Sequence, residues 1–447
     1  MERKRLVILG GGFGGLDVAR SVGRSRKCRA CYDTVLIDKE NFFQFNPLLP
    51  AVAVGAVETR HIVYPLREMA RHNKIRFYKN KVMAIDLAAR TVHLHNDRSE
   101  LYDILAIAMG SVTNYYGVPG AEQHTRPFKT LVDAMTLRAR VVELFEMAEQ
   151  AGTAEQRRML LSILIVGGGV TGVEVAAELL DMARDTLLPR YPSLRAADLS
   201  VTIVEGMDRL VATARPAHSA YVRRFLERRG VTIRLGARVT RVEEKRVTLA
   251  DGATLDAFTI LWTAGVCPPA LVRELPLQHS PDGRIRVDEA LRVLDPSGRA
   301  LPEVYAIGDC AASPRADGRF QPELSQTAIA MGTYVGQRLR RLAAGQPLAP
   351  FRFENVGYII SLGKHSSVLE LFGIPVSGKL AWLAWAAAYL IKMVGVRKQI
   401  EVGLDHLTHL VFTHDTSQIL ARRQILSADE LDLSLEAPAV TNPPPAP

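Results

Sequence analysis

Two runs of glycine with the same internal spacing are the residues that point most directly to chemistry in this chain. In RLVILGGGFGGLDVARSVG an apolar run ends at Leu9, and Gly10, Gly12 and Gly15 fit the pattern G-x-G-x-x-G. Gly10 would permit a tight turn, Gly12 would let the backbone approach a pyrophosphate, and Gly15 would allow a helix to pack closely on the strand. The N-terminus of that helix offers N–H groups to the anion, and Asp38 ends the next apolar run, where it can bind ribose hydroxyls. A lone glycine pattern can mark an ordinary turn, but here strand, helix and acid agree on a dinucleotide site.

The same pattern returns in MLLSILIVGGGVTGVEVAAELL, where Gly167, Gly169 and Gly172 follow a second apolar run. The next apolar run ends in Glu205, and the longer gap before this acid contains YPSLRAADL, which is expected to be a loop. A carboxylate at Glu205 favours a free ribose 2′-hydroxyl and repels a 2′-phosphate, so this site should prefer NADH to NADPH. Arg209 lies nearby and could weaken that preference. Two such units imply two dinucleotides, a bound flavin and a nicotinamide, which is the arrangement of a hydride-transfer enzyme.

The composition is that of a folded protein with several domains. The 447 residues are too many for one core, and 48% apolar with 23% charged residues is ordinary for a globular chain. Four cysteines do not suggest a disulfide framework. The first residues, MERKRLVILGGG, are typical of a buried strand and not of a signal peptide. No run of about eighteen apolar residues predicts a membrane-spanning helix.

The net charge of +9 allows attraction to nucleic acid or to anionic lipid without choosing between them. The densest basic cluster, RSRKCR at 24–29, is expected to be a solvated loop after the first helix. No nucleic-acid-binding motif accompanies it, so no nucleic-acid partner is expected.

A third stretch, LPEVYAIGDCA, places Gly308 and Asp309 directly after an apolar strand. Alone, Asp309 is equally typical of a helix cap. Together with both glycine runs and with LWTAGV at 261–266, the stretch resembles the Gly-Asp segment of flavoproteins that have two dinucleotide domains. In those proteins the aspartate approaches the ribityl–phosphate part of FAD, which is the role that the resemblance implies for Asp309.

Within that superfamily the chain resembles the type II NADH:quinone oxidoreductases, which are single-subunit NADH dehydrogenases that do not pump protons. The likeness extends from about residue 4 to about residue 425. It includes FNPLLPAVAVG, LAIAMGSVTNYYGVPGAEQH, GGGVTGVEVAAEL, AIGDCA, SQTAIAMG and SGKLAWLAWAAAYLIKMVGVRKQI. The last stretch is the most specific, because it lies outside the nucleotide folds that many families share.

The resemblance implies a role for each matching residue. It places Glu174 near the contact between nicotinamide and flavin, although an acid early in a helix is also favoured by the helix dipole. Gln326 and Ala328 match a segment that packs beside the isoalloxazine and the quinone site. The remaining assignments are Gly10, Gly12, Gly15, Asp38, Gly308 and Asp309 to FAD, and Gly167, Gly169, Gly172 and Glu205 to NADH.

One departure from the family pattern concerns the quinone. The family often shows A-Q-x-A-x-Q-Q where this chain reads SQTAIAM at 325–331, so the first glutamine is kept and the pair is replaced by Ala330 and Met331. NADH oxidation is therefore better supported than the quinone type. Lys364, in SLGKHSS, is equally compatible with the quinone tunnel and with the protein surface.

The cysteines argue against a thiol relay. Related disulfide reductases need two close cysteines beside the flavin, and KENFFQFNPLLPAVAVG, where they would lie, has none. Cys28 and Cys31 form C-x-x-C too early in the chain, and no second pair with zinc-ligand spacing completes a metal site. Cys267 and Cys310 do not match the redox cysteines of sulfide:quinone reductases. Electrons should pass from flavin directly to an external acceptor.

An aromatic stripe near the C-terminus predicts contact with a membrane surface. Trp382, Trp385 and Tyr389 recur at three- and four-residue steps, and Lys379 and Lys392 flank an uncharged stretch too short to span a bilayer. Such a helix suits the membrane interface, where Trp and Tyr are enriched. The alternatives are a pair of core helices or a homodimer interface. The first stripe continues at Met393 and Val396, and a second is expected at Ile400, Leu404, Leu407 and Val411.

These observations predict an α/β fold with two Rossmann-like dinucleotide-binding domains and a C-terminal membrane-docking region of amphipathic helices. The FAD-binding domain is expected at residues 1–118 and 271–345, with the NADH-binding domain inserted at 119–270. The membrane-associated region is expected at 346–430, and the Pro-rich tail at 431–447 is expected to be disordered.

The predicted function is hydride transfer from NADH to FAD and delivery of two electrons to a membrane quinone, without proton pumping. The enzyme is expected to be peripheral on the cytoplasmic side of the cell membrane, with NADH, quinone and the lipid surface as partners. Two alternatives stay open. One is an NADH-reducible flavoprotein with a soluble acceptor, in which residues 379–411 form a homodimer interface. The other is an NADH-sensing flavoprotein that docks on a partner instead of turning over.

Overall fold

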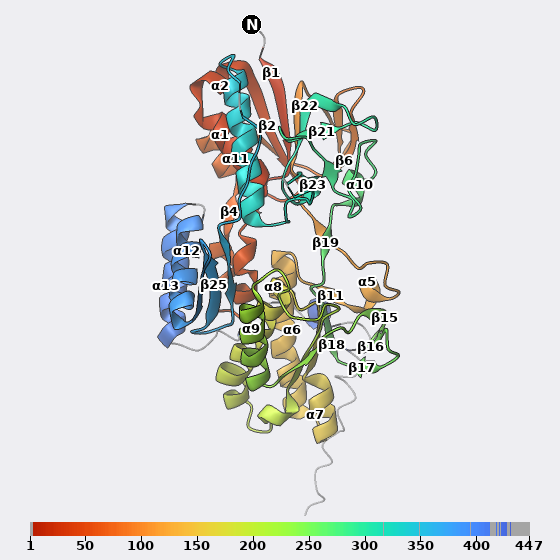
Figure 1. Ribbon diagram of the computed structural model, residues 1–447. Helices are drawn as coiled ribbons and strands as arrows, with labels where there is room; N and C mark the ends of the chain where they lie inside the picture. The colour runs from red at the N-terminus through yellow and green to blue at the C-terminus, as the bar shows by residue number, and fades with distance from the viewer. Residues whose placement is uncertain are drawn as a thin grey trace, which may run out of the picture. The chain divides into compact units, whose positions relative to one another are not determined.

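The computed structural model describes residues 3–315, 317–347, 349–393, 395–411, 417, 420, 422–426 and 430. The chain forms two compact units (Figure 1). The first unit comprises Met1–Gln44, Val63–Val112 and Val266–Asn355, and the second comprises Phe45–Ile62, Thr113–Gly265 and Val356–Pro447. The predicted tail at 431–447 lies outside the described residues.

The first unit is built on a six-stranded sheet in the order β21-β22-β9-β1-β2-β5. Its central strand is fully buried from Leu6 to Leu9, as expected of a parallel strand covered on both faces. The strand β1 pairs with β2 in parallel, from Lys4 opposite Tyr32 to Leu9 opposite Ile37. The bounds are β1 Lys4–Leu9, β2 Tyr32–Asp38, β5 Arg76–Lys79, β9 Ile104–Ile107, β21 Arg292–Leu294 and β22 Ala300–Ala306.

Two helices of the first unit position its glycine-rich turn. Helix α1 (Phe13–Arg24) follows β1, and α11 (Ser325–Leu342) packs along it, as Figure 1 shows. The packing is close because Gly332 of α11 lies against the Gly14 backbone, where even a Cβ would come within 2.3 Å of the Gly14 carbonyl oxygen. The first unit also contains a smaller antiparallel sheet of β6 (Val82–Asp86), β7 (Thr91–Leu94) and β8 (Ser99–Leu101).

The basic cluster after α1 was predicted to be a loop, and this prediction is wrong. Arg26–Cys31 form the short helix α2, which Ser25 caps by accepting a hydrogen bond from the Cys28 N–H at 3.3 Å. Cys28 is fully buried. Burial of this one side chain favours a helix here, although the surrounding residues are basic. All four cysteines are free.

The second unit is built on a five-stranded parallel sheet in the order β11-β18-β12-β13-β14. Its strands are β11 Arg126–Pro127, β12 Ser162–Val166, β13 Ser200–Val204, β14 Val231–Arg234 and β18 Thr259–Trp262. The glycine-rich turn leads from β12 into α8 (Val170–Asp181), and α6 (Leu131–Gln150) and α9 (Pro216–Arg228) belong to the same unit. The unit repeats the strand–turn–helix–strand order of the first.

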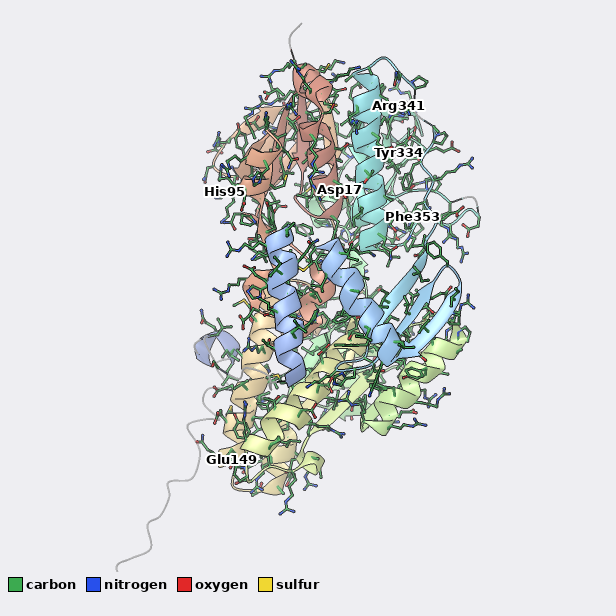
Figure 2. All side chains as sticks on the ribbon, turned by 90° about the vertical axis from the view of Figure 1, so that its left-hand side faces the viewer. Asp17, His95, Glu149, Tyr334, Arg341 and Phe353 are labelled. Atoms are coloured by element: carbon green, nitrogen blue, oxygen red, sulfur yellow. The ribbon has the colours of Figure 1, made fainter. Side chains whose placement is uncertain are left out.

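A three-stranded antiparallel sheet and two helices follow in the second unit, and the short helix α14 (Arg422–Ile425) comes after them. The strands are β24 (Gly357–Ser361), β25 (Ser367–Leu371) and β26 (Ile374–Gly378). Helix α12 (Lys379–Lys392) packs on this sheet and beside α13 (Val396–Val411), and Figure 2 shows both helices in blue. The break between them follows Met393 and includes Gly395 at φ 93°, which agrees with the predicted change of stripe.

Two of the borders between the units fall at 112/113 and 265/266, where 118/119 and 270/271 were predicted, and Phe45–Ile62, within the range predicted for the FAD-binding domain, groups with the second unit. Residues from Val356 onward group with the second unit because β24 packs against α8. Among the described residues, no helix combines the length and apolar character needed to cross a bilayer.

Candidate functional site

The three glycines of the first turn differ in how much space a Cβ atom would have. Gly10 has φ 102°, and a Cβ there would lie 2.2 Å from the Ala108 carbonyl oxygen. A Cβ on Gly15 would lie 1.9 Å from the Gly10 oxygen, which is why only glycine lets α1 pack so closely. A Cβ on Gly12, in contrast, would meet no described atom within 4 Å. The open side of the turn is therefore at Gly12, where a pyrophosphate would approach the backbone.

The start of α1 leaves room for an anion. Gly12 is the N-cap residue, and within the described chain no side chain caps this helix. The first turn also carries no acidic residue. The positive end of the helix is therefore available to a phosphate group.

Asp38 is held at the mouth of this turn by backbone donors. The Gly11 N–H donates to Asp38 Oδ2 at 2.5 Å, and the Glu40 N–H donates to Oδ1 at 2.7 Å. Burial raises the pKa of Asp38, while these two hydrogen bonds act in the opposite direction. Each carboxylate oxygen keeps a lone pair that can accept from a ribose hydroxyl.

The second turn repeats these constraints in the second unit. Gly167 has φ 109°, and a Cβ there would lie 2.7 Å from the Ala264 nitrogen. A Cβ on Gly172 would lie 1.9 Å from the Gly167 oxygen, whereas one on Gly169 would meet no described atom within 4 Å. Gly169 is the N-cap of α8, and among the described residues no side chain caps it.

Glu205 takes the place that Asp38 has in the first unit. The Gly168 N–H donates to Glu205 Oε2 at 2.6 Å, and the Met207 N–H donates to Oε1 at 2.8 Å. Arg209, which the sequence left as a feature that could admit NADPH, donates from Nη2 to the Ala212 carbonyl oxygen at 2.7 Å. The guanidinium of Arg209 therefore stabilises the turn in which Arg209 itself lies.

Gly308 and Asp309 lie at the end of β22, beside the start of α11. Ser111 Oγ donates to Asp309 Oδ2 at 2.6 Å. Gly308 has φ 72°, and a Cβ there would lie 3.4 Å from the Ala328 Cβ. The structure thus brings Gly308, Asp309 and Ala328 together within the first unit, as the sequence predicted for residues around one cofactor.

Met331 explains part of the departure from the family pattern. Its side chain is 1% exposed, and its sulfur accepts a hydrogen bond from the Gly308 N–H at 3.2 Å. Position 331 in this chain therefore supports the Gly-Asp turn. Gln326, in the first turn of α11, is half-buried.

Glu174 is a buried carboxyl and not a first-turn acid. Helix α8 begins at Val170, and Glu174 lies in its second turn with 6% of the residue exposed. The Ser361 N–H donates to Glu174 Oε1 at 2.9 Å. Burial raises the pKa of Glu174 to about 8, against the smaller opposing effect of that hydrogen bond. The helix-dipole explanation for this residue therefore does not hold.

The sequence analysis missed two further carboxyls on the same face of α8. Glu178 accepts from Ser361 Oγ at 3.5 Å, and Asp181 accepts from the Lys364 N–H at 2.6 Å and from the Arg229 guanidinium. Burial raises the pKa of Glu178 to about 8. The spacing of 174, 178 and 181 places all three on one helical face, and this was the signal that could have identified them.

Trp385 of the aromatic stripe faces the inside of the second unit, contrary to its expected lipid contact, whereas Trp382 and Tyr389 are half-buried. Trp385 is 4% exposed, with its ring centre 5.3 Å from that of Tyr389 and 5.4 Å from that of His406. Tyr389 in turn packs against Phe45 at 5.9 Å. Burial is the main cause that raises the pKa of the Tyr389 hydroxyl, and the charge of Glu174 adds to it. The aromatic rings thus cover the region of Glu174.

The opposite side of α12 is the exposed apolar side. Leu380, Leu383 and Ile391 are 72%, 58% and 77% exposed. On α13, the predicted second stripe is also exposed at Ile400, Leu404 and Leu407, and Val396 extends it. The side chain of Val411 lies outside the described set. The exposed apolar side of α12 and the exposed stripe of α13 together form what we call the outward face, which consists of Leu380, Leu383, Ile391, Val396, Ile400, Leu404 and Leu407.

The arrangement in each unit fits one dinucleotide. Each turn combines an open glycine, an uncapped helix start and a carboxylate fixed by two N–H groups, as described above. Within the described residues, no cluster of three His, Cys, Asp or Glu side chains is arranged to hold a metal ion.

Comparison with known proteins agrees with this reading of the fold. The family model described as pyridine nucleotide-disulphide oxidoreductase matches residues 4–332. The chain is 30% identical to the type II NADH:quinone oxidoreductase NdhA of Mycobacterium tuberculosis, over 89% of this chain and 85% of that protein. It is also 30% identical to the demethylphylloquinone reductase NdbB of Synechocystis sp., over 91% of this chain and 96% of that protein.

A solved structure has the same fold over almost the whole chain. NDH2 from Plasmodium falciparum in complex with NADH superposes with a TM-score of 0.85 at 18% identity, covering 93% of this chain and 100% of that chain. With the sequence matches above, the chain belongs to the pyridine nucleotide-disulphide oxidoreductase family and, within it, to the type II NADH:quinone oxidoreductases.

Proposed function

We propose that the chain transfers hydride from NADH to a bound FAD and passes two electrons on to a membrane quinone, without pumping protons. This proposal rests on the pair of matching glycine-rich turns. In each turn, the backbone N–H of the second of three consecutive glycines donates a hydrogen bond to a carboxylate. The Gly11 N–H bonds to Asp38 at 2.5 Å and the Gly168 N–H bonds to Glu205 at 2.6 Å. Two such turns in one chain provide for two dinucleotides, and the family membership specifies which two.

The first unit would hold FAD, with Gly12 at the pyrophosphate, Asp38 at the ribose and Asp309 on the ribityl side. Bound FAD supplies the two-electron chemistry, as it can accept a hydride and later release two electrons. The second unit would hold NADH, with Gly169 at the pyrophosphate and Glu205 at the ribose hydroxyls. The negative charge of Glu205 disfavours a 2′-phosphate, which supports NADH over NADPH.

Glu174 is the residue we assign to proton delivery. The overall reaction, NADH + H⁺ + quinone → NAD⁺ + quinol, takes up one proton from solvent. Because burial raises its pKa to about 8, the Glu174 carboxyl is protonated at neutral pH and can donate a proton, which must then be replaced from solvent because burial disfavours the carboxylate. Gln326 keeps the family glutamine at the quinone side and would orient the quinone ring.

The outward face of α12 and α13 is assigned to the membrane surface, on the cytoplasmic side. A quinone with a long isoprenoid tail resides in the bilayer, so its reductase must reach that phase. Lys379 and Lys392 at the two ends of α12 can extend toward lipid phosphates while the leucines enter the interface. In this assignment the exposed aliphatic side chains, and not the buried Trp385, meet the lipid.

The decisive experiment is anaerobic. The flavin of the purified protein is bleached with NADH, and a short-chain quinone is then added. Rapid return of the oxidised spectrum, with many turnovers of NADH, supports the proposal. Bleaching without reoxidation by quinone contradicts it.

That second outcome would favour one of two other functions, because Met331 replaces a family glutamine. Screening soluble acceptors distinguishes them. Fast reoxidation by a soluble acceptor indicates a reductase of that acceptor, and a homodimer through residues 379–411 is then tested by molar mass. Slow reoxidation by every acceptor indicates an NADH sensor.

A further inference from the structure

The turn between β25 and β26 exposes three apolar side chains in sequence. We call Leu371, Phe372, Gly373 and Ile374 the apical turn. Leu371, Phe372 and Ile374 are 44%, 76% and 65% exposed. Phe372 and Gly373 have φ 49° and 80° and form a two-residue hairpin turn. Both values lie in the left-handed region, where hairpins of this type prefer Asn or Gly.

Phe372 is therefore an unfavourable choice for the stability of the hairpin itself. A bulky side chain at positive φ is strained, and an aromatic ring that is mostly exposed to solvent recovers little of that cost. Asn at this position would form the turn more easily. An exposed aromatic ring held in a strained conformation points to a role for its apolar surface.

The register of the sheet places the apical turn on the same side as α12. Tyr358 pairs with Glu370, and both side chains contact α9 and its N-cap: the Tyr358 hydroxyl lies 2.8 Å from His218 Nδ1, and Glu370 binds Arg215 at 2.6 Å. Because neighbouring residues of a strand point to opposite faces, Leu371 and its partner Ile374 lie on the other face. Helix α12 packs on this sheet, so it covers the face that α9 leaves open.

Two backbone groups of the apical turn and the acid beside it have polar partners, which favours entry into a less polar phase. The Phe372 N–H donates to the Val356 carbonyl oxygen at 2.8 Å, and Arg215 Nη2 donates to the Gly373 carbonyl oxygen at 3.0 Å. The acid nearest in sequence, Glu370, is neutralised by Arg215. From Leu371 to the residue before Lys379 the sequence carries no charge. Burying this segment in a lipid interface would therefore leave neither of these polar groups nor a charge unpaired.

We propose that the apical turn is a second membrane contact, which inserts Phe372 into the interface of an anionic bilayer on the α12 side of the sheet. The inference rests on the proposed membrane association. It adds a contact separate in sequence from the outward face. Aromatic rings prefer the headgroup boundary, and Lys379, which is exposed at the far end of β26, is suited to lipid phosphates. Helix α12, which carries part of the outward face, packs on the same sheet, and this makes a bilayer a better occupant than a second copy of the chain.

The test is co-sedimentation of the full-length flavoprotein with vesicles of phosphatidylcholine and phosphatidylglycerol. Phe372→Asn removes the ring and suits the turn, so the variant should fold at least as well as the original chain. We expect its vesicle partition to weaken about tenfold, the equivalent of removing one large apolar side chain from the interface. Phe372→Trp should keep the original partition. Val132→Gln, at an equally exposed valine of α6, is the matched control and should change nothing.

Two comparisons separate this inference from the proposed function. If Phe372→Asn leaves the partition unchanged while Leu383→Ser weakens it, the apical turn is no membrane contact but the outward face is. If neither Phe372→Asn nor Leu383→Ser changes the vesicle partition, then neither the apical turn nor the outward face is a membrane contact. If Phe372→Asn instead lowers the molar mass in solution and leaves the vesicle partition unchanged, the turn contacts a second copy of the chain and the inference is wrong.

Discussion

Asp38 and Glu205 show how one side chain can serve both a turn and a ligand. Each carboxylate accepts hydrogen bonds from two backbone N–H groups. One belongs to a glycine of the turn, Gly11 or Gly168, and the other belongs to the residue two positions after the acid. These bonds orient the carboxylate without using all of its lone pairs. We therefore propose that the charge at this position sets the nucleotide preference, while the two hydrogen bonds that the carboxylate accepts hold the turn.

This separation predicts the effect of Glu205→Gln. The amide keeps one acceptor for the turn but removes the charge that repels a 2′-phosphate. We expect the ratio of kcat/KM for NADPH to that for NADH to rise about tenfold, which corresponds to about 1.4 kcal/mol of differential binding. Steady-state kinetics with both nucleotides measure it. Asp208→Asn, at an exposed acid three residues on, is the control, and an equal rise there would contradict a specific role for Glu205.

The buried Glu174 carboxyl predicts a pH-dependent stability. Its folded pKa of about 8 exceeds its ordinary value of 4.5, so between these values the folded state holds a proton that the unfolded chain releases. The stability contribution is thus fully present below pH 4.5 and is lost as pH rises toward 8. Glu174→Gln removes this loss, and we expect it to raise the unfolding free energy at pH 8 by on the order of 1–3 kcal/mol, with no gain near pH 4.

Urea unfolding at several pH values measures this effect. Glu155→Gln, at an exposed glutamate of the same unit, should show no such pH-dependent gain. The same Glu174→Gln protein should still be bleached by NADH but reduce quinone at least about tenfold more slowly, as expected for loss of a general acid. Unchanged quinone turnover would remove Glu174 from proton delivery.

At the scale of elements, different glycines of the turn that joins β1 to α1 are required for helix packing and for the proposed cofactor contact. A methyl group on Gly15 would lie 1.9 Å from the Gly10 oxygen, whereas one on Gly12 would meet no described atom within 4 Å. Helix packing therefore depends on Gly15, and cofactor access depends on Gly12.

Two alanine variants test this division. Gly12→Ala should unfold at the temperature of the original apoprotein but purify with little flavin, because the methyl group occupies the open side of the turn. Gly15→Ala should lower the unfolding temperature of the apoprotein by several degrees, because the methyl group clashes with backbone. Flavin-to-protein ratios and thermal unfolding are the measurements. A flavin-replete Gly12→Ala protein would refute the assignment of this turn to FAD.

At the scale of the whole molecule, charge and apolar surface should act together at the membrane. In the proposed membrane association, the net charge of +9 would attract the chain to anionic lipid, and the outward face would supply the apolar contact. Salt screens the first effect and leaves the second.

We therefore expect binding to phosphatidylglycerol-containing vesicles to weaken with added salt and then level off at a residual value. The Leu383→Ser and Ile391→Ser double variant should lose the residual binding and keep the salt-sensitive part. Leu101→Ser, at an exposed leucine of the first unit, is the control and should behave as the original chain. Vesicle sedimentation across a salt series measures both parts. Binding that vanishes at high salt in every protein would exclude an apolar contribution.

Much of this protein could be predicted from short stretches of sequence. The two turns were recognisable because each depends on contacts among a few neighbouring residues: an apolar strand, a glycine pattern of six residues and a helix. The family resemblance then linked these turns to FAD, NADH and quinone, and the comparisons confirm the family. A second helix was also predictable from the second apolar stripe that begins at Ile400, but the first stripe was expected to continue to Val396, which the structure places in α13.

The tertiary structure alone decided which way other side chains face. Glu174 meets Ser361 only because residues 187 positions apart pack together, and Met331 reaches Gly308 in the same way. Helix α12 is apolar on every side between its two lysines, so its sequence permitted either face to be buried, and packing against β25 and α13 buried Trp385. Periodicity reveals that a face is apolar, but only the partners that cover it determine whether it meets protein or lipid.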